Sequence, residues 1–104
     1  MQYNKLVRDK IPEIISQKGE QSTWHVADNE EYELKLHEKL REEVDEFLKS
    51  EDEDEIADIL EVLDAIIVHH EFSKEDIMMA KDFKKAKRGG FEKRIILDYI
   101  QQKI

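Results

Sequence analysis

The chain has no cysteine, one proline and three glycines among its 104 residues. The missing cysteine excludes disulfides and thiolate metal sites, and it leaves nothing that favours secretion. No apolar run approaches the about 18 residues of a membrane-spanning helix. The opening residues, MQYNKLVRDK, are too polar for a signal peptide. We therefore expect a cytoplasmic protein without a membrane partner.

Positive charge is also scarce, since 17 Lys and Arg residues face 26 Asp and Glu residues and the formal net charge is -9. Long-range repulsion then opposes binding to nucleic acid or to an anionic membrane surface. A ligand that carries phosphate would need a metal ion or a local basic cluster. The length predicts a single domain over residues 1–104 with a modest core, to which dimerisation would add.

Capping residues predict one short helix and three longer ones. The short helix covers residues 9–18, with Asp9 as N-cap, Pro12 in its first turn and Gly19 at its end. The pairs Asp28/Glu31 and Ser73/Asp76 resemble capping boxes, and Ser50 or Asp52 caps the helix between them. The long helices should end near residues 49, 71 and 88. Residues 21–27 (QSTWHVA) predict a short strand, which the start of the C-terminal tail could pair with.

Acidic residues interrupt the apolar faces of the first two long helices. On a helical wheel the first helix gathers Tyr32, Leu36, Leu40, Val44 and Phe47 into one arc. Glu43 falls inside this arc and Glu46 lies at its edge. The second helix is apolar around nearly its whole circumference, yet it carries Glu55, Asp58, Glu61 and Asp64. A buried carboxylate must be protonated, paired with a cation or bound to a metal.

A tight antiparallel hairpin would bring these acids together. If the turn centres near residues 50 and 51, Glu46 lies level with Glu55, and Glu43 lies level with Asp58. Four converging carboxylates repel one another, and a divalent cation is the simplest remedy. Oxygen-only ligands favour Mg²⁺, Mn²⁺ or Ca²⁺ over zinc. The predicted metal ligands are therefore Glu43, Glu46, Glu55 and Asp58.

Other interpretations of the acids compete with this one. Runs such as EEVDE and SEDEDE are often solvated faces, and Glu61 fits a ligand, a base for water or a partner of Lys39. Asp64 fits a structural role. A carboxylate di-iron site is excluded because no histidine follows a glutamate by three residues on these helices. An EF-hand is excluded because SEDEDEIADILE lacks the central glycine. The four histidines then fit structural or surface roles.

Four segments in order resemble one protein family: YNKLVRDKIPEII, KLREEVDEFL, EIADILEVLDAI and KAKRGGFEKRIIL. With an ExxE from Glu43 to Glu46 and an ExxD from Glu55 to Asp58, the chain resembles the MazG-like all-α nucleoside triphosphate pyrophosphohydrolases. The resemblance is closer to their phosphoribosyl-ATP pyrophosphohydrolase-like subgroup. One departure is that only eight residues separate Glu46 from Glu55, which is shorter than is common in MazG proteins.

The resemblance implies a mainly α fold, namely an all-α NTP pyrophosphohydrolase-like helical bundle that is completed by dimerisation and has a minor β element. It implies Mg²⁺-dependent hydrolysis between the α- and β-phosphates of a nucleoside triphosphate, with Mn²⁺ as an alternative ion. Glu46 or Glu61 would activate the water. The phosphates would meet Arg8, Lys10, Arg88 and Arg94, because arginine binds phosphate through paired hydrogen bonds. The partner would be a second copy, with exchange of segments left open.

Three other functions stay open. The first is phosphoribosyl-ATP hydrolysis in histidine biosynthesis. The second is metal-dependent nucleotide binding without turnover. The third is a plain helical interaction dimer with solvated acids.

Overall fold

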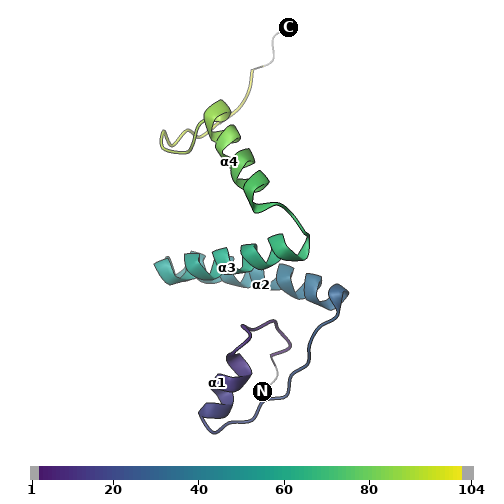
Figure 1. Cartoon of the computed structure of the whole chain (residues 1–104). Coiled ribbons are helices and arrows are strands. Elements are labelled where there is room, and N and C mark those ends of the chain that lie inside the picture. The colour runs from purple at the N-terminus through teal and green to yellow at the C-terminus, as the bar shows by residue number, and fades with distance from the viewer. Residues whose placement is uncertain (1–2, 102–104) are drawn as a thin grey trace. The chain divides into compact units, whose positions relative to one another are not determined.

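The computed structural model describes residues 3–101, and within them the chain is mainly helical, as predicted (Figure 1). The helices are α1 (Ile11–Gln17), α2 (Asn29–Ser50), α3 (Glu53–His69) and α4 (Lys74–Arg88). None of those described is both long and apolar enough to cross a membrane. The chain divides into two compact units, Met1–Glu71 and Phe72–Ile104, which are taken separately below. The single domain stays a prediction.

The predicted N-caps of the three longer helices are confirmed. Asp28 accepts a hydrogen bond from the Glu31 backbone N–H at 2.9 Å. Asp52 caps α3, and the Ser73 hydroxyl accepts from the Asp76 backbone N–H at 3.1 Å. These oxygens satisfy N–H groups that have no partner within the first helical turn.

The N-cap predicted for α1 was wrong, because Lys10 rather than Asp9 precedes its first residue. Pro12 explains the start: a proline has no N–H and a fixed φ, so it fits the first turn of a helix and constrains where that turn begins. The end was predicted correctly, since Gly19 follows the helix with φ +83° in the left-handed region that favours glycine.

Two residues, Glu51 and Asp52, join α2 to α3. Glu51 adopts a left-handed conformation with φ 53°, and its N–H donates to the Phe47 carbonyl at 2.7 Å. This bond ends α2, and Asp52 at once caps the next helix. A connection this short leaves the two helices antiparallel and side by side, as Figure 1 shows.

The core of the hairpin is small. Among the described residues, Leu36 on α2 and Val62 on α3 are the buried hydrophobic side chains, at 1% and 8% exposure. On α3 a second apolar stripe with helical spacing, Ile56, Leu60 and Leu63, is 38–56% exposed. The helix is therefore apolar on two sides, but α2 covers only one of them.

The strand predicted for residues 21–27 is not formed, and no strand occurs elsewhere in residues 3–101. This segment and the tail after α4 are both irregular. A strand needs the hydrogen-bonding edge of another strand, and Thr, Trp and Val content alone does not supply one. The β propensity of QSTWHVA is therefore not expressed within the described chain.

Replacing Leu36 by Ala should lower the free energy of unfolding by about 2–5 kcal/mol, because it opens a cavity between α2 and α3. The matched control is Leu34→Ala on the same helix, where the side chain is 57% exposed. Urea unfolding followed by circular dichroism measures both variants. Equal losses would contradict the placement of Leu36 at the centre of the core.

Candidate metal site

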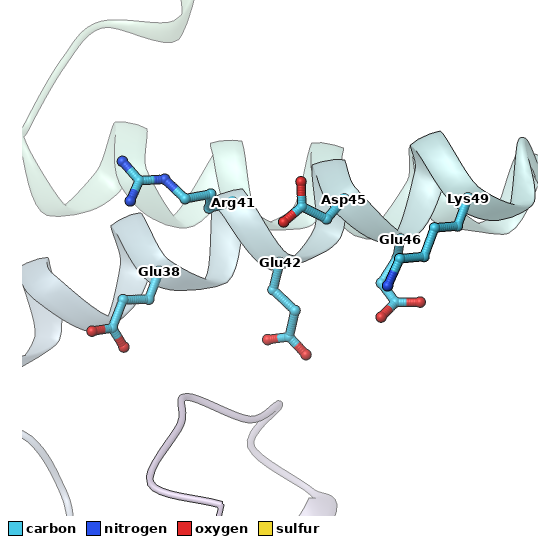
Figure 2. A pocket seen from close by; sticks show the side chains of 6 residues that line it. All are labelled: Glu38, Arg41, Glu42, Asp45, Glu46 and Lys49. Carbon is cyan, nitrogen blue, oxygen red and sulfur yellow. The ribbon is translucent and has the colours of Figure 1, made fainter.

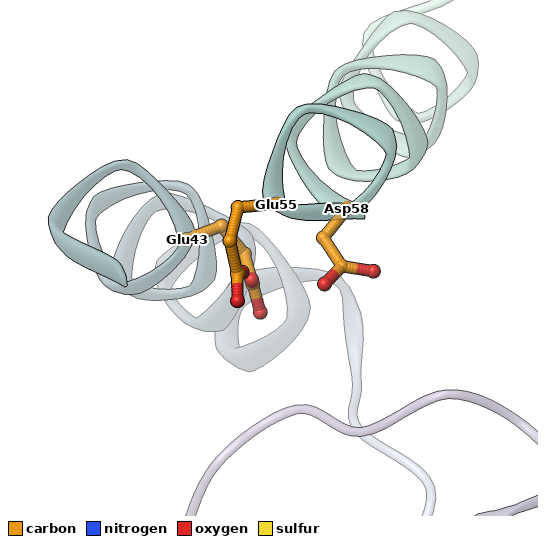
Figure 3. A group of neighbouring side chains, drawn as sticks. All are labelled: Glu43, Glu55 and Asp58. Carbon is orange, nitrogen blue, oxygen red and sulfur yellow. The ribbon is translucent and has the colours of Figure 1, made fainter. Parts of the chain in front are cut away.

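Three of the predicted ligands converge at one side of the hairpin. Glu43 comes from α2, whereas Glu55 and Asp58 come from the first two turns of α3. One carboxylate oxygen from each lies within 4.8 Å of the others. Glu43 is the buried member, at 9% exposure, and the other two are half-buried. Figure 3 shows all three carboxylates pointing to the same side of the helix pair.

Helical spacing explains this convergence. Glu55 and Asp58 are three residues apart, so they occupy neighbouring turns of one face of α3. Glu43 sits in the apolar stripe of α2, which the short connection turns toward that face. The predicted proximity of Glu43 and Asp58 is confirmed.

The spacing and the chemistry of the three oxygens can be compared with what hard divalent cations require. Mg²⁺ binds oxygen at 2.0–2.1 Å, so two of its ligands can be at most about 4.2 Å apart, and for Ca²⁺ the limit is about 5 Å. Only opposite ligands reach that distance, whereas neighbouring ligands of an octahedral ion lie about 3 Å apart, so oxygens up to 4.8 Å apart would have to approach one another to bind one Mg²⁺ together. The donor set is also all oxygen, which these ions and Mn²⁺ prefer.

Two cations partly compensate the charge of the group. The Arg8 guanidinium lies 2.9 Å from Asp58, and the Lys39 ammonium lies 3.4 Å from Glu43. No cation of the described residues contacts Glu55. Partial burial, and then repulsion from Asp58 and Glu43, raise the pKa of Glu55 above its usual value. Three carboxylates and two cations leave a net negative charge beside a carboxylate that lacks a counter-ion.

The fourth predicted ligand, Glu46, lies outside the group of three. It is exposed, and together with Glu42 it lines a shallow, open depression on α2 (Figure 2). It is nevertheless close enough for its charge to add to the raised pKa of Glu55. Glu61 is exposed on α3, one turn beyond Asp58. For both residues, the role of ligand or base stays a prediction.

Of the predicted phosphate-binding residues, Arg8 lies at the acidic group through its contact with Asp58. Lys10 is exposed at the start of α1. Arg88 ends α4, and Arg94 lies in the turn that follows with φ 57°. These two belong to the second unit, so their meeting with a substrate at this group stays a prediction.

Sequence reasoning missed the roles of Lys5 and Glu42. Their side chains form an ion pair at 2.9 Å, and this hydrogen bond raises the pKa of Lys5 and lowers the pKa of Glu42. The two residues are 37 positions apart in sequence, so no local pattern predicts their contact. Lys39 contacts Glu42 and Glu43 rather than Glu61, and its spacing of four from Glu43 was a signal that could have been used.

Histidine takes no part in the acidic group. His69 and His70 lie 3.4 Å and 3.7 Å from Glu33, and His69 packs edge-on against Tyr32. His25 contacts Glu31 at 2.8 Å. These contacts agree with the structural or surface roles expected for them.

Replacing Glu55 by Gln should raise the melting temperature of the metal-free protein at pH 7, because the substitution removes a repelled charge. The raised pKa means that the folded wild type is destabilised by ionised Glu55 and regains that stability as the pH falls through this pKa. The difference between variant and wild type should therefore shrink toward pH 4, a pH near the unperturbed value of about 4.3. Thermal unfolding in EDTA at both pH values measures it.

The control for this experiment is Glu53→Gln, which removes an exposed charge from the same helical turn but lies outside the group. Both variants lose the same kind of favourable interaction with the helix N-terminus. A Glu55→Gln variant that melts no higher than the control at pH 7 would contradict the repulsion.

Comparisons with known proteins add no relative: no family model matches the chain, and no curated protein and no solved structure matches it either.

Proposed function

We propose that the protein is a Mg²⁺-dependent nucleoside triphosphate pyrophosphohydrolase, which releases a nucleoside monophosphate and pyrophosphate in a house-cleaning role. The observation that carries the proposal is the group of Glu43, Glu55 and Asp58, whose oxygens lie within 4.8 Å of one another across two helices. The ordered sequence segments that resemble the MazG-like family support it.

The residues divide the work as follows. Glu43, Glu55 and Asp58 would hold the ion, and Arg8 would meet the phosphates beside them. A bound Mg²⁺ supplies positive charge against the triphosphate and lowers the pKa of a water. Glu46 or Glu61 takes a proton from the water as its oxygen attacks the α-phosphorus. The bond from this phosphorus to the oxygen that bridges to the β-phosphate then breaks, and pyrophosphate leaves.

Net charge makes the ion necessary. The chain carries a formal charge of -9, and a triphosphate adds several more negative charges at the site. Arg8 and Lys39 neutralise only two of the three carboxylates. A divalent cation would complete the compensation and attract the substrate to an otherwise repelling surface.

The test is an assay of pyrophosphate release from a panel of nucleoside triphosphates with Mg²⁺, with phosphoribosyl-ATP included. Asp58→Asn should lower turnover about 10²- to 10³-fold, the effect of losing several kcal/mol of metal-ion stabilisation. The control Asp54→Asn, on the same helix but outside the group, should retain activity. Absence of pyrophosphate from every substrate, with a folded protein, rejects the proposal.

The same panel separates the alternatives. Turnover of phosphoribosyl-ATP alone assigns the enzyme to histidine biosynthesis. Metal-dependent nucleotide binding without turnover identifies a binding protein. An unchanged melting temperature on addition of Mg²⁺ or Mn²⁺ favours a helical interaction dimer, since an ion that binds the folded state should raise it.

A homodimer is the assembly that we propose for the active protein. It is supported by the small core of the chain and by the exposed stripe of Ile56, Leu60 and Leu63 on α3. Stripes of this kind are typical of helix–helix interfaces, because apolar residues spaced by three and four positions share one face. The minor β element, and any exchange of segments, would then involve both copies.

Light scattering after gel filtration should therefore give twice the mass of the chain. Leu60→Glu should shift the protein toward the monomer, because it places a charge in the apolar stripe. Val26→Glu, at an 85% exposed position in the irregular segment before α2, serves as the control and should remain dimeric. A monomeric wild type at micromolar concentration would refute the proposed assembly.

A further inference from the structure

Residues 4–8, termed here the N-terminal segment, are fastened to both helices of the hairpin. The Asn4 carbonyl accepts a hydrogen bond from Lys35 at 2.6 Å, and Lys5 pairs with Glu42 at 2.9 Å, so two contacts reach α2. The third contact, from Arg8 to Asp58 at 2.9 Å, reaches α3. In Figure 3 the faint purple trace of the N-terminal part of the chain passes on the side to which the three carboxylates point.

Only one of the three contacts involves a carboxylate of the acidic group. Lys35 and Glu42 lie outside the acidic group, whereas Asp58 belongs to it. Arg8 therefore donates to one of the carboxylates that would bind the ion. Its side chain is 57% exposed, so it can leave Asp58 without uncovering a buried charge.

A divalent cation and the Arg8 guanidinium compete for Asp58. If the ion binds the Asp58 oxygen that Arg8 contacts, a metal–oxygen distance of about 2.1 Å and the guanidinium contact of 2.9 Å place the ion within about 5 Å of the Arg8 nitrogen. Like charges at this distance repel, and the ion also withdraws electron density from the carboxylate that Arg8 uses. Lys5 would keep the segment in place meanwhile, because Glu42 is not a ligand.

We infer that Arg8 is a displaceable counter-ion of the acidic group: it neutralises Asp58 in the metal-free protein, and a divalent cation releases it to bind the phosphates of the substrate. This inference rests on the proposed function. It assigns to one residue two partners in succession, a carboxylate before the ion binds and a phosphate afterwards. The planar guanidinium suits both, since each offers two oxygens to parallel N–H donors.

The inference predicts effects of opposite sign on two ligands. Arg8→Gln should tighten Mn²⁺ binding without nucleotide by about two- to fivefold, the size expected from removing an exposed ion pair. With saturating Mn²⁺, the same variant should bind a non-hydrolysable triphosphate analogue about tenfold or more weakly, because a charge-assisted phosphate contact is lost. Isothermal titration calorimetry measures both affinities on the full chain.

Two further variants sharpen the result. Lys18→Gln removes the same kind of charge from an exposed position that makes no ion pair with the acidic group, and it should change Mn²⁺ affinity less than about twofold. Arg8→Lys keeps the charge but loses the planar fork, so Mn²⁺ affinity should stay near that of the wild type while analogue binding remains weakened. Circular dichroism verifies that each variant is folded.

Weaker or unchanged Mn²⁺ binding by Arg8→Gln overturns the inference, and so does a gain that Lys18→Gln reproduces. If this occurs while the wild type still binds Mn²⁺ and hydrolyses a triphosphate, the proposed function survives and only the displacement fails. If the wild type binds no divalent cation, both fail together.

Discussion

The packing of α2 on α3 is the constraint on which the rest of the described structure depends. Leu36 and Val62 are buried where the two helices meet, and the two-residue connection fixes which turns of the helices face each other. This register brings Glu43 next to Asp58. A register shifted by one or two residues would rotate the carboxylates to different sides of the pair, and no site would exist.

The position of Glu43 couples stability to chemistry. It lies in the apolar stripe of α2, where a hydrophobic residue would pack without electrostatic cost, and it is nearly as buried as the core. Lys39, whose ammonium lies 3.4 Å from Glu43, partly neutralises this buried carboxylate, and Arg8 does the same for Asp58. Among the described residues, Glu55 has no such cation beside it, and partial burial together with repulsion from its acidic neighbours raises its pKa. A divalent cation bound here, as proposed, would relieve this repulsion.

Long-range contacts of the N-terminal segment bring two further basic side chains to the hairpin. Lys5 and Arg8 come from a part of the chain far from α2 and α3 in sequence, and they place basic groups at the edge of an acidic surface. The proposed polyanionic substrate would need such local reversals of charge to bind an acidic protein. The same contacts hold the segment against both helices.

The sequence by itself determined the helices, their caps at Asp28, Asp52 and Ser73, and the convergence of Glu43 with Asp58, because these follow from local hydrogen bonds and helical periodicity. Only the tertiary structure decided that Arg8 and Lys5 reach α3 and α2, and that Glu46 stays outside the group of three. It also left residues 21–27 without a strand, since pairing requires an edge that propensity does not provide. Such contacts depend on the path of the whole chain and on competition among several cations for the same carboxylates, and neither is encoded in a local pattern.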